Sequence, residues 1–376
     1  LKIMRKFMDA DNAVRIQYAT KYARTSNYWK YYIGQTKGLK RLKVSDKKRE
    51  QESAFQKWVD ADPKRKEKYG EALTLREEAV DAMRTVNLSQ IYLNEAISRG
   101  SEILMYSRRF NELKDLLEAK DEDEAAIEKE IEQLRKRARS HFEDYYQPID
   151  KSILAAMLEM YYENVPKPQQ PEMLAEIHDK YDGFDEYAEK LFDKSIFATE
   201  ERVNDFLDKP KSKKIEKDPA YELVNAFLGI YPEIRDVMGE AYQKQSRGER
   251  LYIAGLREMN PDRVYYPDAN FTMRLTYGQV LDYYPADAVH YDYYTTLSGV
   301  MEKEDPSNWE FVVPEKLKEL YKEKDYGPYG KDGEMVVGFI TNNDITGGNS
   351  GSPVMNGKGE LIGLAFDGNW EAMSGD

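Results

Sequence analysis

Apolar residues recur every three or four positions through the first two thirds of the chain, and this spacing predicts α-helices. The clearest stretch would place on one helix face Ile127, Ile131, Leu134, Ala138, Phe142 and Tyr145. Acidic residues at 121–124 precede this stretch and basic residues cluster at 135–139, an order that complements the helix dipole. Similar spacing predicts helices at 9–24, 47–60, 65–85, 87–119, 150–163, 171–179, 183–193, 197–207, 219–228 and 231–257.

The pattern changes from about residue 266 onwards. Apolar and polar residues alternate over 270–280, which is typical of a β-strand, and residues 289–296 are rich in Tyr and Thr, which favour strands. Further signals predict a short helix at 314–324, strands at 335–340, 354–355 and 361–366, and a turn at 356–359. The sequence therefore predicts an α+β protein, with a helical domain at 1–265 followed by part of a mostly β domain at 266–376.

Residues 346–353, here called the Ser350 loop, read Thr-Gly-Gly-Asn-Ser-Gly-Ser-Pro and lie between two predicted strands. A serine hydroxyl becomes a nucleophile when a sharp loop exposes it, backbone N–H groups face the developing oxyanion, and an imidazole takes its proton. Gly348 allows a backbone conformation that is closed to other residues. We therefore expect Ser350 to be the nucleophile of a chymotrypsin-like serine peptidase, with the N–H groups of Gly348 and Ser350 as the oxyanion hole.

The loop has two alternative interpretations. The α/β-hydrolase elbow needs a second glycine two residues after the serine, and Ser352 occupies that position. The other alternative is a glycine-rich structural turn without chemistry. A loop between two strands suits an antiparallel barrel, which favours the peptidase.

Composition excludes several function classes. The net charge of -13 argues against a nucleic-acid partner, because phosphate contacts need a basic surface. The chain has no cysteine, so disulfides, cysteine nucleophiles and thiolate metal sites are excluded. No apolar run approaches the length of a membrane span, and no signal peptide is visible. Because the 376 residues begin at Leu1 rather than Met, we expect them to be an internal piece of a longer protein.

A catalytic triad would also need a histidine and an acidic residue, and the chain has three histidines. His141 is expected on the surface of a charged helix, and His178 near a helix end. His290, in a Tyr-rich strand, is the best local candidate for the base. The chymotrypsin order places both partners before the serine, so we expect the histidine and the aspartate upstream of Leu1.

Longer motifs carry a resemblance to a known family. Residues 26–30, 293–303, 341–353 and 363–371 resemble the bacterial dipeptidyl-peptidase 7 and dipeptidyl-peptidase 11 family, and the likeness spans essentially the whole chain. The resemblance implies a double chymotrypsin-like β-barrel with a helical insert. Residues 1–265 would be that insert, incomplete at its N-terminus, and 266–376 part of the second barrel.

The resemblance also implies a function. Members of the family are periplasmic homodimers that need no metal or cofactor and release dipeptides from the free N-termini of oligopeptides. We expect the same of the full-length protein, and expect this piece alone to be inactive without the first barrel. An inactive relative, or a peptide-binding or scaffold module, stays open as the alternative.

Individual residue roles follow from the resemblance. Ser350 matches the nucleophile, and Asn27 and Asp367 match residues that hold the substrate's terminal amine, to which an amide oxygen and a carboxylate are suited. Their local alternatives are a helix cap for Asn27 and a hairpin turn at Asp367 and Gly368. Members that prefer acidic side chains before the cleaved bond have an arginine where this chain has Gly368. We therefore expect an apolar preference, as in the dipeptidyl-peptidase 7 type.

Overall fold

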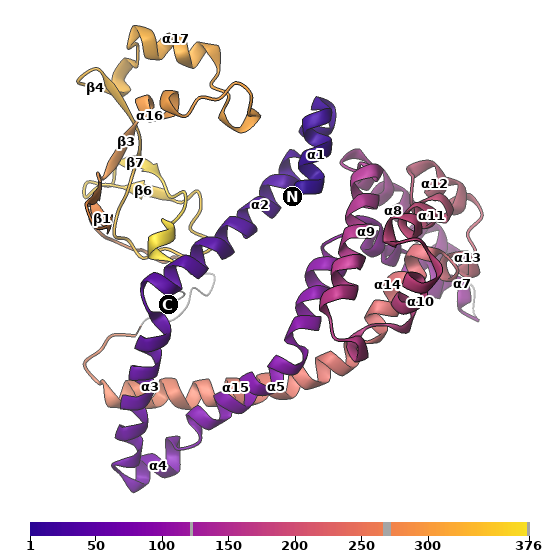
Figure 1. The fold of residues 1–376 in the computed structure, drawn as a ribbon, viewed down its shortest axis with the longest axis horizontal. Coiled ribbons are helices and arrows are strands. Elements are labelled where there is room, and N and C mark those ends of the chain that lie inside the picture. Colours follow the sequence, from indigo (N-terminus) through magenta and orange to yellow (C-terminus); the bar gives the residue numbers. More distant parts are fainter. Residues whose placement is uncertain (121–122, 266–271, 374–376) are drawn as a thin grey trace. The chain divides into compact units, whose positions relative to one another are not determined.

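A computed structural model of the chain describes residues 1–120, 123–265 and 272–373. The chain forms two compact units, coloured along the sequence in Figure 1. The first unit contains residues 1–31 and 46–263, and the second contains residues 32–45 and 264–376. Helix α2 (Asn12–Arg41) contributes to both. The division into domains at residue 265 stays a prediction, and it did not anticipate that residues 32–45 join the second unit.

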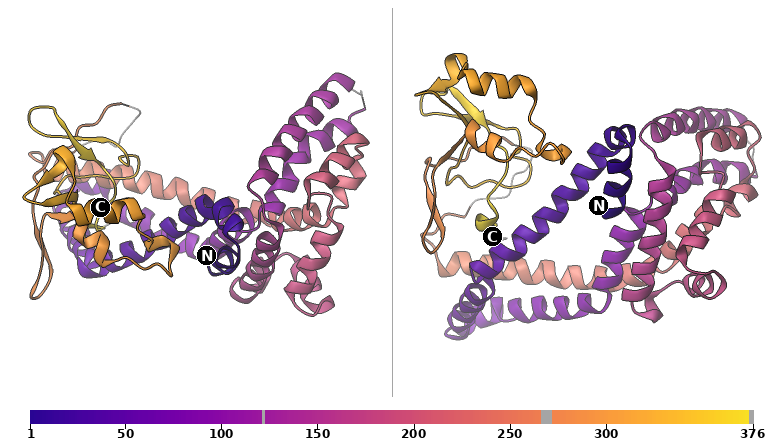
Figure 2. Two further views of the ribbon diagram at one scale, coloured as in Figure 1. Left: turned by 90° about the horizontal axis from the view of Figure 1, so that it is seen from above. Right: turned by 45° about the horizontal axis from the view of Figure 1, so that its top comes forward.

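The first unit is helical throughout its described residues, as the periodicity predicted. Besides α2, its helices are α1 (Lys2–Ala10), α3 (Val44–Asp60), α4 (Pro63–Tyr69), α5 (Ala72–Tyr92), α6 (Glu102–Ser107), α7 (Asn111–Glu118), α8 (Glu124–Glu143), α9 (Gln147–Asn164), α10 (Glu172–Lys180), α11 (Phe184–Lys194), α12 (Glu200–Asp208), α13 (Ser212–Glu216), α14 (Pro219–Gly229) and α15 (Tyr231–Met259). Helices α5 and α15 pack along one another, and Figure 2 shows the pair from two further directions.

Three expected helices had wrong bounds. The helix expected at 65–85 is two helices, α4 and α5, interrupted at Gly70 and Glu71. The helix expected at 9–24 is divided at Asp11, whose Oδ1 accepts the N–H of Ala13 at 2.8 Å and so starts α2, which then runs far beyond residue 24. The single helix expected at 87–119 is broken after a π-helical turn at Leu93–Ser98. Apolar spacing continues across the last two breaks, so only the local caps could have revealed them.

The main core of the first unit lies where α6 to α14 converge. Its fully buried side chains include Leu104, Phe110, Leu158, Phe197 and Phe227. A separate small cluster joins α3, α4, the start of α5 and α15 through Phe55, Val59, Tyr69, Ala72, Tyr252 and Leu256. Burial of these apolar surfaces stabilises the unit, at roughly 1.5–3 kcal/mol for each large side chain.

One buried carboxylate joins α9 to the start of α6. Asp150 is 1% exposed, and its two oxygens accept the N–H groups of Glu102 at 2.6 Å and Ile103 at 2.9 Å. The hydroxyl of Tyr145 donates to the same side chain at 2.9 Å. Asp150 therefore caps a helix from a distant part of the sequence, which no local motif predicted.

His141 is not the surface residue that its charged helix suggested. Its ring stacks on Tyr106 with centroids 4.0 Å apart, and its Nε2 is buried without a hydrogen-bond partner among the described residues. Burial, helped by the positive charges of Lys21 and Arg109, lowers the pKa of His141 to about 4. Aromatic residues of α6 and α8 thus bury a residue that helix periodicity alone would place near solvent.

Among its described residues, the second unit combines short strands with the C-terminal part of α2 and two helices of its own. The strands are β1 (Tyr283–Ala286), β2 (Val289–Tyr291), β3 (Tyr294–Thr296), β4 (Gly330–Lys331), β5 (Glu334–Phe339), β6 (Pro353–Met355) and β7 (Leu361–Leu364), and the helices are α16 (Leu297–Glu302) and α17 (Glu315–Glu323). All the pairings are antiparallel, in the orders β1-β2, β3-β5-β4 and β6-β7. The chain is therefore α+β, as expected, and the helix at 314–324 and the strands near 335–340, 354–355 and 361–366 are confirmed.

The strand expected at 270–280 is wrong for residues 272–279, and residues 270 and 271 lie outside the described part. Met273 and Tyr277 are 97% and 89% exposed, and only Val280 forms a bridge, to Thr341. The alternating pattern was real, but a strand needs a neighbour that accepts its backbone hydrogen bonds. The described residues supply none along 272–278, and Gln279 is hydrogen-bonded to Asn342 next to the bridge.

The strand expected at 289–296 is instead two strands that join different sheets. Strand β2 pairs with β1, whereas β3 pairs with β5. Between them the N–H of Tyr293 donates to the carboxylate of Asp292 at 2.7 Å, which interrupts the strand. Short polar side chains compete with a sheet for backbone donors, and this explains the break.

No helix among the described residues is both long and apolar enough to cross a lipid bilayer.

The buried histidine leads to a prediction about acid stability. Because the pKa of His141 is about 4 in the folded protein and about 6.5 in an unfolded chain, its contribution is complete above pH 6.5 and is lost as the pH falls to 4. His141→Phe should therefore become progressively more stable than the wild type across this window. Urea unfolding of both proteins at pH 7.5, 5.5 and 4.5 measures the difference. A difference that stays constant with pH would show that His141 titrates normally in the folded protein.

Candidate active site around Ser350

The Ser350 loop connects β5 to the β6-β7 hairpin and is anchored by backbone pairing on its C-terminal side. In the hairpin, Pro353 pairs with Leu364. The ladder continues past the ends of both strands, because the N–H of Gly351 donates to the carbonyl of Ala365 at 2.8 Å and the N–H of Ala365 donates to the carbonyl of Ser352 at 2.8 Å. Ser350 is therefore the first residue beyond a continuous ladder.

The N-terminal side of the loop is held by Asn349. The N–H of Thr346 donates to Oδ1 of Asn349 at 3.0 Å, and the N–H of Asn349 donates to the carbonyl of Thr346 at 3.2 Å. Gly348 and Gly351 have φ angles of +98° and +81°, which side chains with a Cβ rarely adopt. The glycines thus allow the chain to reverse on both sides of Ser350, as the sequence analysis expected for Gly348.

The backbone N–H groups of Gly348 and Ser350 donate to no acceptor within the described part of the chain, whereas those of Asn349, Gly351 and Ser352 all donate hydrogen bonds. Both residues are exposed. The loop therefore leaves available the two donors that an oxyanion hole requires.

None of the three histidines is hydrogen-bonded to Ser350 in the described residues. His290 does have an orienting carboxylate, since its Nε2 lies 2.6 Å from Oδ2 of Asp282 on the β1-β2 side of the second unit. Its ring stacks on Tyr284 at 4.7 Å. His178 lies near the end of α10, as expected, and stacks on Tyr162 at 4.2 Å.

The residues expected to hold the substrate's amine lie in different elements. Asn27 is an exposed residue in the interior of α2, so the helix-cap alternative is wrong. Asp367 and Gly368 follow β7 and precede a short 3-10 turn at Trp370–Ala372. The described residues after β7 contain no strand, so the hairpin alternative is wrong as well.

The local geometry at these two positions leaves space for a ligand. The carboxylate of Asp367 is exposed and accepts the N–H of Gly368 at 2.8 Å. A Cβ added at Gly368 would meet no atom within 4 Å. A larger side chain can therefore occupy this position without a steric clash.

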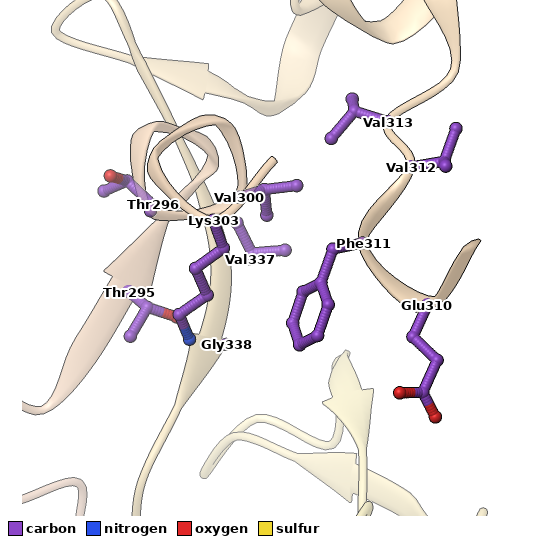
Figure 3. A pocket seen from close by; sticks show the side chains of 11 residues that line it. Thr295, Thr296, Val300, Lys303, Glu310, Phe311, Val312, Val313, Val337 and Gly338 are labelled. Atoms are coloured by element: carbon purple, nitrogen blue, oxygen red, sulfur yellow. The ribbon is translucent and has the colours of Figure 1, made fainter. Parts of the chain in front are cut away.

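A pocket of about 390 Å³ in the second unit was not anticipated from the sequence. Figure 3 shows Val300, Val337 and Phe311 turned towards the same space, with Lys303 at one side. It lies between β3, α16, β5 and the segment 310–313, and none of the expected site residues lines it. Its lining residues are scattered over 43 positions between Thr295 and Gly338, which is why no motif identified it. Among the described residues, no group of three or more His, Cys, Asp or Glu could hold a metal ion.

The profile of the family described as Peptidase S46 matches residues 1–376. The chain belongs to this family. Among its relatives, dipeptidyl-peptidase 7 of Phocaeicola vulgatus is 44% identical over 377 residues, which cover 100% of this chain and 52% of the relative. The Asp/Glu-specific dipeptidyl-peptidase of Porphyromonas gingivalis is 36% identical, with 100% and 52% of the two chains covered.

The solved structures give the same assignment. The crystal structure of Porphyromonas endodontalis DPP11 in complex with the dipeptide Arg-Glu matches this S46 chain with a TM-score of 0.86 at 34% identity. The match covers 100% of this chain and 53% of that one. The chain thus spans about half the length of the S46 relatives that it matches, and the resemblance seen in the sequence motifs is confirmed.

Proposed function

We propose that this S46 protein is a serine-type dipeptidyl-peptidase, which releases dipeptides from the free N-termini of oligopeptides. The observation that carries the proposal is the Ser350 loop, in which an exposed serine lies two residues after a glycine of positive φ, and the N–H groups of both residues have no acceptor among the described residues. The names of the relatives support the dipeptide product.

In this proposal Ser350 Oγ attacks the carbonyl carbon of the substrate's second residue, and its proton passes to a base. The N–H groups of Gly348 and Ser350 donate to the oxyanion of the tetrahedral intermediate. The C-terminal peptide leaves with the proton, and water then hydrolyses the acyl-enzyme. The ladder through Ala365 keeps the serine in place during both steps.

We propose that the base and its aspartate come from outside residues 1–376, so that this chain alone is inactive. The aromatic stacking of His141 and His178 within the first unit supports this assignment, as does the lack of a hydrogen bond between His290 and Ser350 in the described part of the chain, where His290 is instead bonded to Asp282. The coverage of about half of each relative leaves room for such a segment.

We further propose that Asp367 and Asn27 bind the substrate's α-ammonium group. The group carries positive charge and donates hydrogen bonds, so an exposed carboxylate and an amide oxygen are suitable partners. The match of both residues to the family's motifs supports these roles.

The side chain before the cleaved bond is proposed to lie near Gly368 and to be apolar. A substrate carboxylate in a pocket without a cation would cost roughly 2–5 kcal/mol, whereas burying an apolar side chain contributes about 1.5–3 kcal/mol. The identity of 44% to a dipeptidyl-peptidase 7, against 36% to an Asp/Glu-specific relative, also supports this preference.

From the family resemblance we also propose that residues 266–376 are part of a second chymotrypsin-like barrel, and that the intact protein is a periplasmic homodimer. The antiparallel pairing of β3 with β5 and of β6 with β7 supports the barrel.

The nucleophile and base assignments are tested together. In the intact protein, Ser350→Ala should lower kcat/KM by roughly 10³-fold or more with an unchanged Tm, because only one exposed oxygen is lost. His290→Ala should leave most of the activity, since the proposed base lies elsewhere. Hydrolysis of dipeptide-coumarin substrates and thermal melting measure both variants. A loss in His290→Ala as large as in Ser350→Ala would place the base in this chain instead.

The amine anchor predicts how a blocked substrate behaves. Asp367→Asn should raise KM for a free dipeptide-coumarin by about 10–100-fold, because a charge-assisted hydrogen bond is lost. The N-acetylated substrate should be cleaved poorly by the wild type and no worse by the variant. Asp332→Asn, at an exposed turn of the same unit, serves as the matched control and should change neither value. Equal cleavage of the free and acetylated substrates by the wild type would remove the amine-anchor role.

Gly368 predicts the specificity. The wild type should prefer Leu or Phe over Asp or Glu before the cleaved bond, and Gly368→Arg should narrow or reverse this preference, because a guanidinium pairs with a carboxylate. An added Cβ at Gly368 meets no atom within 4 Å, so the substitution causes no clash where the side chain begins. The measurement is kcat/KM for the four substrates with both proteins. A wild type that already prefers Asp or Glu would contradict the assignment of Gly368.

A further inference from the structure

The part of α2 that belongs to the second unit carries two buried glycines, Gly34 and Gly38. Residues four apart lie on the same face of a helix, so the two glycines form a shallow groove there. The segment Trp370–Met373, which follows the proposed specificity residues Asp367 and Gly368, lies in this groove. No motif in the sequence indicated a role for these two glycines.

The contact is too close for any other residue. A Cβ at Gly38 would lie 2.1 Å from the carbonyl oxygen of Met373 and 3.0 Å from that of Trp370. A Cβ at Gly34 would lie 2.8 Å from the sulfur of Met373 and 3.2 Å from Cβ of Trp370. Gly38 therefore meets backbone, which must shift as a whole, whereas Gly34 meets mainly the movable end of a side chain.

Two charged side chains of the same helix, Lys37 and Arg41, also contact the segment. The Nζ of Lys37 lies 5.7 Å from the ring centroid of Trp370, within the range of a cation–π interaction. The guanidinium of Arg41 donates to the carbonyl of Glu371 at 3.4 Å and to that of Pro285 at 3.4 Å. Glu371 is 8% exposed, so the segment is a packed element rather than a loose tail.

Asp367 and Gly368 consequently lie between two contacts that hold the chain in place, here called anchors. On one side, Ala365 is paired with both Gly351 and Ser352 of the Ser350 loop. On the other side, Trp370–Met373 is seated on α2. The few residues between these two contacts belong to no helix or strand. The contacts on either side therefore fix the position of the Asp367 carboxylate.

We propose that Gly34 and Gly38 are positioning residues for substrate recognition, which set the place of Asp367 and Gly368 by seating the segment that follows them. The inference rests on the proposed function. It differs from the proposed residue roles because neither glycine contacts the substrate. It also separates two tasks in the second unit, since the Ser350 loop is held by its own ladder and not by α2.

The test compares Gly38→Ala with wild type in the intact protein. The variant should raise KM for a free dipeptide-coumarin by about tenfold or more, and should reduce the discrimination between free and N-acetylated substrates. Labelling of Ser350 by a small fluorophosphonate, which needs neither an amine nor a side-chain pocket, should proceed within about twofold of the wild-type rate. Gly34→Ala should show the same changes to a smaller extent, and it decides the question if Gly38→Ala does not fold.

Gly239→Ala is the matched control, because Gly239 also lies within a helix and an added Cβ there meets no atom within 4 Å. It should change neither KM nor the labelling rate. An unchanged KM in both Gly34→Ala and Gly38→Ala would overturn the inference, as would a labelling rate that falls in proportion to kcat/KM. Failure of the wild type to be labelled at Ser350 would instead contradict the proposed function itself.

Discussion

The backbone pairing of Ala365 is the interaction on which the candidate site depends. Its carbonyl accepts the N–H of Gly351 and its N–H donates to the carbonyl of Ser352, each at 2.8 Å. These two bonds extend the β6-β7 ladder up to the residue next to Ser350. A nucleophile must be held in one geometry while its neighbouring N–H groups stay free for an oxyanion, and a ladder that ends one residue earlier meets both needs.

The same pairing connects the Ser350 loop with the proposed recognition residues. Residues that follow Ala365 lead directly to Asp367, and the chain is then seated on α2 through Gly38. The Ser350 loop and the proposed recognition residues therefore share the pairing of Ala365. The contact with α2 holds only the recognition residues. Under the proposed roles, a substitution near residue 368 would alter the specificity without displacing the serine.

Much of the fold could be predicted from sequence because its signals are local. Helix periodicity predicted the helices of the first unit. The glycines at 348 and 351 indicated the sharp loop, because a positive φ angle is a property of single residues. The failures share one cause. The alternation predicted a strand that has no partner strand along 272–278 among the described residues, and His141 was expected at the surface because its buried neighbour Tyr106 is distant in sequence.

The sequence by itself determined the α+β class, the family and the identity of the candidate nucleophile, because periodicity, glycine positions and long motifs are all written along the chain. Only the tertiary structure decided which N–H groups of the loop stay free, that His290 is bonded to Asp282, and that Gly38 faces the carbonyl of Met373. Each of these depends on residues that are far apart in sequence. These contacts follow from side-chain packing and strand register, which composition and residue spacing do not determine.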